Sequence, residues 1–192
     1  MIDWNNTSGL PSHGYQCGYC GYSVGSDRGY IGVDRFDGTV GRIYICPHCT
    51  NPTFFHSYST QVPDVRPGND VEDVPDDVND LYDEARSCVA ACAYTASVLA
   101  SRKLLMNIAV SRGAKEGLRF VEYVEYLANN NYVPPDGKDW VAHIRGKGNE
   151  ATHEIAMMQR EDAVELITLS EMLLKFIYEF PARVKAKKSP GP

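Results

Sequence analysis

The stretches Cys17-Gly-Tyr-Cys20 and Cys46-Pro-His-Cys49 decide how the first third of this 192-residue chain folds. Each is a CxxC turn, and a separation of 25 residues leaves room for one β-hairpin around each turn. Zn²⁺ takes four soft ligands in a tetrahedron, and two such turns on adjacent hairpins complete that set. We therefore expect the four cysteines to bind a structural Zn²⁺, because four thiolates leave no open position for a catalytic water.

Other roles for these cysteines are less favoured. Two disulfides or a redox CxxC pair would need a secreted chain or a βαβ context, and the sequence indicates neither. His48, inside the second turn, would become a ligand only by displacing a cysteine. A zinc hydrolase is disfavoured, since the thiolates use up the metal and no other His, Asp and Glu cluster has ligand spacing.

The surroundings of the cysteines favour turns and short strands. Residues 1–60 hold nine of the sixteen glycines and show no helical periodicity, and residues 29–33 and 41–45 have the pattern of short strands. Aromatic residues accompany the cysteines. They either cover a small ribbon core, which we favour, or stack on nucleic-acid bases. These residues are Tyr15, Tyr19, Tyr22, Tyr30, Tyr44, Phe54, Phe55 and Tyr58.

The rest of the chain divides by composition. Residues 61–77 are acidic and carry three prolines, which is typical of an extended linker. Residues 78–184 have helical patterning, and residues 185–192 form a basic tail. The predicted fold is mostly α, a five-helix bundle with a small N-terminal β zinc ribbon over residues 1–60. The expected helices run from about 78 to 92, 95 to 111, 118 to 129, 138 to 158 and 161 to 179, the last ending before Pro181.

The first expected helix carries a pair of cysteines. Leu81, Ala85, Cys88 and Cys92 recur at helical spacing and should share one apolar face. The two cysteines are either small packing residues, which we favour, or a redox pair.

The stretch from His143 to His153 contains the strongest candidates for catalysis. Arg145, Asn149 and His153 lie four residues apart, so on a continuous helix they form one polar stripe. Arginine can hold a phosphodiester, histidine can move a proton at neutral pH, and asparagine can orient either group. From spacing alone, the favoured explanation of the stripe is a buried polar network that ties two helices together.

The helical part resembles the bacterial family called domain of unknown function 4145. The resemblance covers roughly residues 76–184 and is carried by Asp83-Glu84-Ala85-Arg86-Ser87-Cys88, by Ala96 to Arg102, by Ile144 to His153, and by Glu161 to Pro181. That family is similar to the HEPN helical domains, many of which are dimeric, metal-independent ribonucleases. The resemblance implies a HEPN-like bundle and a homodimer. It also implies that His153 assists 2′-OH attack on the adjacent phosphate, that Arg145 stabilises the developing charge, and that Asn149 positions both.

Composition sets the broader expectations. The formal net charge is −6, so the surface as a whole does not attract nucleic acid. No apolar stretch approaches the length of a membrane span, and no signal peptide is visible, so we expect a cytoplasmic protein. The resemblance to HEPN domains implies RNA binding and endoribonuclease activity in antiphage defence or a toxin system. The alternative is a non-catalytic module whose zinc ribbon binds nucleic acid or a protein partner.

Overall fold

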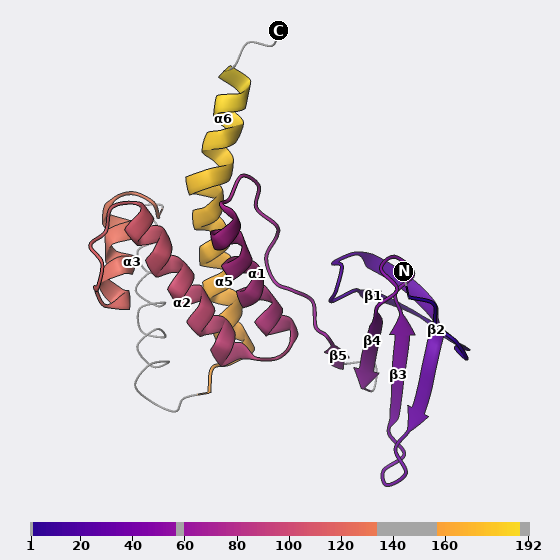
Figure 1. Cartoon of the computed structure of the whole chain (residues 1–192). Helices are drawn as coiled ribbons and strands as arrows, with labels where there is room; N and C mark the ends of the chain where they lie inside the picture. Colours follow the sequence, from indigo (N-terminus) through magenta and orange to yellow (C-terminus); the bar gives the residue numbers. More distant parts are fainter. Residues whose placement is uncertain (1, 57–59, 134–156, 189–192) are drawn as a thin grey trace. The chain divides into compact units, whose positions relative to one another are not determined.

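The computed structural model describes residues 2–56, 60–133 and 157–188 of the chain. These residues form two compact units (Figure 1). One unit comprises Met1–Arg66 with Ala90–Cys92, and the other Pro67–Val89 with Ala93–Pro192. We call them the sheet unit and the helical unit and describe each by itself.

The sheet unit is a five-stranded antiparallel meander in which each strand pairs with the next along the chain. The two predicted strands are confirmed as parts of β2 and β3, whereas β1, β4 and β5 were not predicted. The first and last strands of the sheet come together at one point, where the Gln61 Nε2 of β5 donates to the Gln16 carbonyl at the end of β1 at 2.8 Å. The sheet is therefore curled. The strands are β1 Ser8–Gln16, β2 Ser23–Val33, β3 Val40–Ile45, β4 Pro52–His56 and β5 Thr60–Val62.

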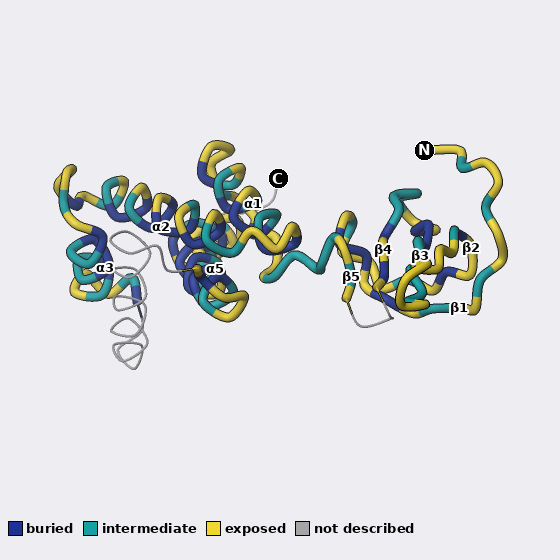
Figure 2. Tube along the Cα trace, turned by 90° about the horizontal axis from the view of Figure 1, so that it is seen from below, coloured by how far each residue is buried: buried dark blue, intermediate teal, exposed yellow. Residues whose placement is uncertain are grey.

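The curl encloses a small aromatic core. Tyr15, Tyr44 and Phe55 are buried there with two of the cysteines, Cys17 and Cys46. The His13 ring packs edge-on against Phe55 with centroids 4.6 Å apart. The preferred interpretation of the aromatic residues is therefore confirmed for Tyr15, Tyr44 and Phe55, while Tyr19, Tyr22 and Phe54 are exposed. Figure 2 shows that the sheet unit contains both buried and exposed stretches.

The helical unit begins with three helices close to the predicted ones. They are α1 Asp76–Ala90, α2 Tyr94–Ser111 and α3 Phe120–Asn129. The prediction of the apolar face of the first helix is wrong, because the buried face is rotated from the predicted face by part of a turn. The buried apolar residues are Val78, Tyr82, Ala85, Val89 and Ala90, because the Tyr82 ring enters the core. Cys92 lies beyond the end of α1 with φ 59° and is exposed, so it does not share a helix face with Cys88.

The last helix continues where the sequence predicts a stop. It runs through α5 Arg160–Leu174, the π-helical turn η2 Lys175–Glu179 and α6 Phe180–Lys188. Pro181 has no N–H and its ring crowds the preceding turn, which normally ends or kinks a helix. Here the turn before it is widened, and the Phe180 N–H bonds to the Lys175 carbonyl five residues back. The wider turn accommodates the proline without ending the helix.

The predicted fold class is therefore wrong. In the described ranges the chain forms four helical segments (α1, α2, α3 and the continuous α5–η2–α6) and a five-stranded antiparallel sheet, not a five-helix bundle with a small ribbon. The sheet was underestimated because its register joins strands through contacts that no short pattern reveals. The expected helix 138–158 lies outside the described residues except for Met157 and Met158, which precede α5 and are not helical. No helix in the described part of the chain is long and apolar enough to cross a membrane.

Candidate metal centre

Two turns of matching geometry carry the four cysteines. The first lies between β1 and β2, and the second between β3 and β4. In the first, the Gly21 N–H bonds to the Cys17 carbonyl at 2.8 Å. In the second, the Thr50 N–H bonds to the Cys46 carbonyl at 2.9 Å. The strand hydrogen bonds thus bring two turns with the same backbone hydrogen bond to the same end of the sheet.

The sulfur positions fit a tetrahedral metal site. The Sγ atoms of Cys17 and Cys49 are 3.7 Å apart, those of Cys20 and Cys46 are 3.9 Å apart, and all four lie within 4.8 Å of one another. A disulfide needs about 2.05 Å, so these pairs are not bonded. Four thiolates at about 2.3 Å from a central Zn²⁺ would be about 3.8 Å from one another. The four residues therefore suit a Zn²⁺ ion, as the spacing predicts.

The thiol acidities indicate why a cation belongs at this site. Burial raises the pKa of the Cys20 thiol to about 12 and raises the pKa of the Cys46 thiol above its ordinary value. Burial also acts against ionisation of Cys49, but hydrogen bonds from the Asn51 backbone N–H and the other thiols lower its pKa. Four thiolates gathered in a buried cluster need a positive charge to offset their desolvation and mutual repulsion.

The closed set of sulfur ligands points to a structural role. Four protein ligands leave no position for water or substrate, so such a metal would stabilise the fold without taking part in a reaction. His48 does not join the four ligands, because its ring stacks on that of Tyr22 with a centroid distance of 3.8 Å and an interplanar angle of 19°. Within the described ranges, the four cysteines are the one group of three or more His, Cys, Asp or Glu residues close enough to share a metal ion.

The two turns differ at the residue that follows the second cysteine. That position requires a left-handed backbone, and Gly21 adopts it freely at φ 72°. Thr50 holds φ 60°, which is uncommon for a β-branched residue. Two groups of the N-terminal segment support it: the Ile2 N–H donates to the Thr50 hydroxyl at 3.0 Å, and the Trp4 indole N–H donates to its carbonyl at 2.8 Å. The second turn is thus held from outside as well as by its own hydrogen bonds.

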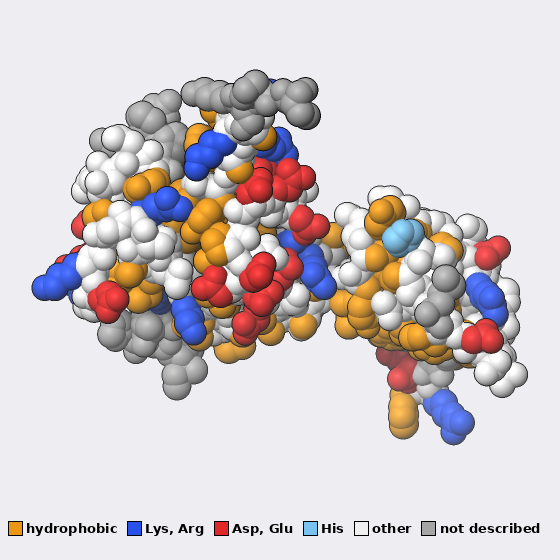
Figure 3. Space-filling model, turned by 45° about the horizontal axis from the view of Figure 1, so that its top comes forward, with side chains coloured by type: hydrophobic (Ala, Val, Ile, Leu, Met, Phe, Trp, Pro, Cys, Tyr) orange, Lys and Arg blue, Asp and Glu red, His pale blue; other side chains and the backbone are white. Residues whose placement is uncertain are grey.

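Aromatic side chains are exposed beside the metal centre. Tyr22 is 58% exposed and Tyr19 46% exposed, and His48, whose ring stacks on Tyr22, is exposed as well. Figure 3 shows hydrophobic side chains gathered at the surface of the sheet unit. The turn residues 17–23 and 46–51 include no aspartate or glutamate.

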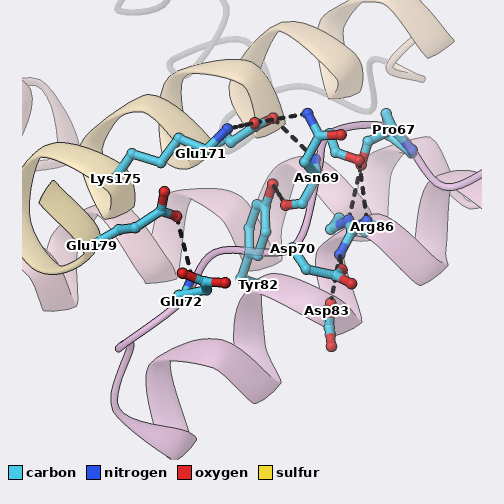
Figure 4. A network of polar contacts seen from close by, with 11 residues as sticks. Pro67, Asn69, Asp70, Glu72, Tyr82, Asp83, Arg86, Glu171, Lys175 and Glu179 are labelled. Carbon is cyan, nitrogen blue, oxygen red and sulfur yellow. Dashed lines mark hydrogen bonds and ion pairs between the residues drawn. The ribbon is translucent and has the colours of Figure 1, made fainter. Parts of the chain in front are cut away.

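The helical unit holds a second polar constellation that sequence reasoning did not identify (Figure 4). Arg86 is 6% exposed and donates from Nη1 to Asp70 at 2.6 Å and to Asp83 at 2.9 Å. Its Nε and Nη2 atoms donate to the carbonyls of Pro67 and Gly68 at 2.9 and 3.1 Å. Burial by itself would lower the pKa of this guanidinium, but the partnership with Asp70 raises it. We call the segment that Arg86 holds, residues 67–72, the strap.

The strap is also held by the last helix. Asn69 donates from its backbone N–H and from Nδ2 to the two carboxylate oxygens of Glu171 at 3.1 and 3.0 Å, and Lys175 pairs with the same carboxylate. The Glu72 N–H donates to the Glu179 carboxylate at 3.2 Å, and Arg183 approaches Glu179 at 2.9 Å. Every charge in this constellation has a partner, so it fixes the fold and does not form an open reaction site.

Signals for this constellation were present in the sequence. The residues Glu171, Lys175, Glu179 and Arg183 alternate in charge at four-residue spacing, which is the pattern of helical ion pairs. The strap was interpreted as part of an acidic linker, which hid its role.

The predicted catalytic residues lie outside the described ranges. Arg145, Asn149 and His153 fall within residues 134–156, so their arrangement stays a prediction.

Comparisons with known proteins place the helical part. A family model described as "Domain of unknown function (DUF4145)" matches residues 83–189, which is more than half of the chain. Neither the curated proteins nor the solved structures contain a match to this chain.

Proposed function

This chain belongs to the DUF4145 family, and from that premise we propose that it is a HEPN-like protein that acts on RNA as a metal-independent endoribonuclease. The observation that carries the proposal is the extent of the family match, residues 83–189, because it encloses Arg145, Asn149 and His153 in a single domain. We place the protein in the cytoplasm, and the resemblance to HEPN proteins implies that it acts as a homodimer in antiphage defence or a toxin system.

The proposed chemistry needs only the chain's own side chains. The neutral His153 imidazole accepts the proton of a ribose 2′-OH, and the 2′-oxygen attacks the adjacent phosphorus. The bond from phosphorus to the 5′-oxygen breaks, and that oxygen leaves as an alcohol after taking a proton from solvent water. Arg145 pairs with the phosphate and stabilises the charge that develops, while Asn149 orients the two groups. The products are a 2′,3′-cyclic phosphate and a 5′-OH end.

The metal centre has a separate part in this proposal. Cys17, Cys20, Cys46 and Cys49 hold Zn²⁺ that stabilises the sheet unit and takes no part in RNA cleavage.

An RNA-cleavage assay with the full chain tests the proposal. Wild type should cleave RNA with EDTA added at the moment of mixing, and its products should end in a cyclic phosphate. His153→Ala should lose the activity while keeping its far-UV circular dichroism spectrum. His143→Ala is the matched control, a histidine of the same stretch outside the proposed stripe, and should cleave normally. Cleavage that persists in His153→Ala, or that is absent from wild type, would contradict the ribonuclease proposal.

A second candidate is a non-catalytic module whose sheet unit binds nucleic acid or a protein partner. The exposed Tyr22–His48 stack with Tyr19 beside it favours this alternative, since aromatic rings stack on bases at about 1–3 kcal/mol each. Under this alternative, a Tyr19→Ala/Tyr22→Ala variant loses RNA affinity, while His153→Ala does not. Phe36→Ala, which removes a fully exposed ring elsewhere in the sheet unit, is the matched control.

A further inference from the structure

An apolar stripe runs along the outside of the last helix. Met172, Phe176, Phe180 and Val184 follow one another at four-residue spacing across α5, η2 and α6. The last three are 49%, 41% and 52% exposed, which is unusual for large side chains repeated on one helix face. The rings of Phe176 and Phe180 meet edge to face with centroids 5.4 Å apart.

A hollow lies along this stripe. It has a volume of about 280 Å³ and is open to the surface. Its walls combine the two phenyl rings and a thioether with the aliphatic stem of a lysine, so an apolar side chain from another molecule would fit there. The residues that line it are Thr168, Glu171, Met172, Lys175, Phe176 and Phe180.

The C-terminal part of the same rod is poorly packed within its own unit. From Phe180 to Lys187 every residue is exposed except Ala182, which is half-buried. Helices of this length gain most of their stability from tertiary packing. The exposed α6 with an apolar stripe on it is therefore expected to pack against another surface.

Charge is distributed unequally along the rod. The first turn of α5 is acidic, with Glu161 and Asp162, and the end of α6 is basic, with Lys185 and Lys187. A second identical rod placed antiparallel across the stripe would bring the basic end of each rod toward the acidic start of the other. The rod thus carries both halves of a complementary surface, which is what a two-fold symmetric contact requires.

We propose that this stripe is the interface between two copies of the chain, with the two α5–η2–α6 rods antiparallel and the phenyl rings of each copy in the hollow of the other. Each interface residue is then used twice, once from each copy. The proposal gives an interface to the homodimer of the proposed function, and the two can fail separately, because the solution mass is measured without RNA and the cleavage assay does not probe this rod.

The solution mass of the full chain tests the interface. Wild type should elute as a dimer with a light-scattering mass of twice 21.3 kDa at about 100 µM, and dissociate on dilution. Phe176→Asp/Phe180→Asp should be a monomer at the same concentration, because buried unpaired carboxylates would face each other across the two-fold axis. Phe36→Asp, at a fully exposed ring of the sheet unit, is the matched control and should stay a dimer. Circular dichroism establishes that each variant is folded.

A charge exchange tests the antiparallel arrangement. Lys187→Glu and Glu161→Lys should each weaken the dimer about three- to tenfold, since each contact occurs twice by symmetry. The variant that carries both changes should regain wild-type affinity. A monomeric wild type, or a dimer that survives Phe176→Asp/Phe180→Asp, would overturn the interface. Failure of the double charge variant to regain affinity would overturn the antiparallel arrangement.

Discussion

The sheet unit and the helical unit solve the problem of stability in different ways. Among the described residues, the buried apolar cluster of the sheet unit has five members, and two of these, Cys17 and Cys46, are candidate metal ligands. The corresponding cluster of the helical unit has twenty-four members. A small domain buries too little surface to offset the entropy of folding, so it needs a metal or cross-links, whereas a large apolar core does not. The stability of the sheet unit should therefore depend on a metal, and that of the helical unit should not.

The largest expected effect is the loss of the metal. Cys46→Ser should unfold the sheet unit, because metal binding in small zinc domains supplies about 10–16 kcal/mol of folding free energy. Amide hydrogens of β1 to β5 should lose their protection from exchange, and those of α1 to α3 should keep it. Hydrogen exchange with mass spectrometry measures both units in one sample.

The matched control for this change is Cys92→Ser. Cys92 is exposed and lies outside the sulfur cluster, so the variant should exchange like wild type. Equal protection of the β-strands in Cys46→Ser and Cys92→Ser would show that the sheet unit does not depend on a metal.

The next effect concerns the polar network of the helical unit. Arg86→Ala should lower the free energy of unfolding by about 2–4 kcal/mol, because it removes four hydrogen bonds, two of them to backbone carbonyls of the strap, while the exposed carboxylates of Asp70 and Asp83 regain water. Chemical denaturation followed by far-UV circular dichroism measures it. Arg119→Ala, which removes an exposed pair with Glu122, should have little effect. Similar losses in the two variants would mean that burial does not strengthen the Arg86 network.

A smaller effect on stability is expected from alanine substitutions at two glycines, which compare a steric clash with the cost of the backbone conformation alone. Gly68 has φ 71°, and an added Cβ would lie 2.6 Å from the Tyr82 hydroxyl and 3.0 Å from a Glu171 carboxylate oxygen. Gly117 has φ 78°, but nothing lies within 4 Å of its Cβ position. Gly117→Ala should therefore cost only the backbone conformation, about 1 kcal/mol, and Gly68→Ala about 2–3 kcal/mol. Differential scanning calorimetry of both variants gives the difference, and equal costs would contradict a close-packed strap.

The sequence could predict local features of both units. The metal ligands were predictable because a CxxC turn fixes two sulfurs within four residues. The helix α3 was predictable because its apolar residues recur at helical spacing, and the end of α2 was predictable because Gly113 follows it. The five-stranded sheet was not, since Gln16 and Gln61 meet across 45 residues. The helix through Pro181 was also missed, because the widened turn before it depends on hydrogen bonding that no local pattern signals. The role of the strap was missed for the same reason, because the Asn69 N–H donates a hydrogen bond to Glu171, which lies 102 residues away in the sequence.

The smallest expected effect is a pH dependence in the helical unit. Burial acts to raise the pKa of Glu171, but the hydrogen bonds from Lys175 and Asn69 outweigh it and lower the pKa below its ordinary value. A carboxylate with a lowered pKa stabilises the folded state above the pKa of the unfolded chain, and that contribution is lost as the pH falls through the folded pKa. Since the carboxylate is partly hydrated, the contribution should be below about 1 kcal/mol and should disappear below about pH 4.

Glu171→Gln should lose this part of the acid dependence, whereas Glu84→Gln, at an exposed position of α1, should keep it. Denaturation midpoints of the three proteins between pH 3 and pH 7 measure the difference. If the denaturation midpoints of all three proteins change equally with pH, the ionisation of Glu171 does not contribute to the stability of the helical unit.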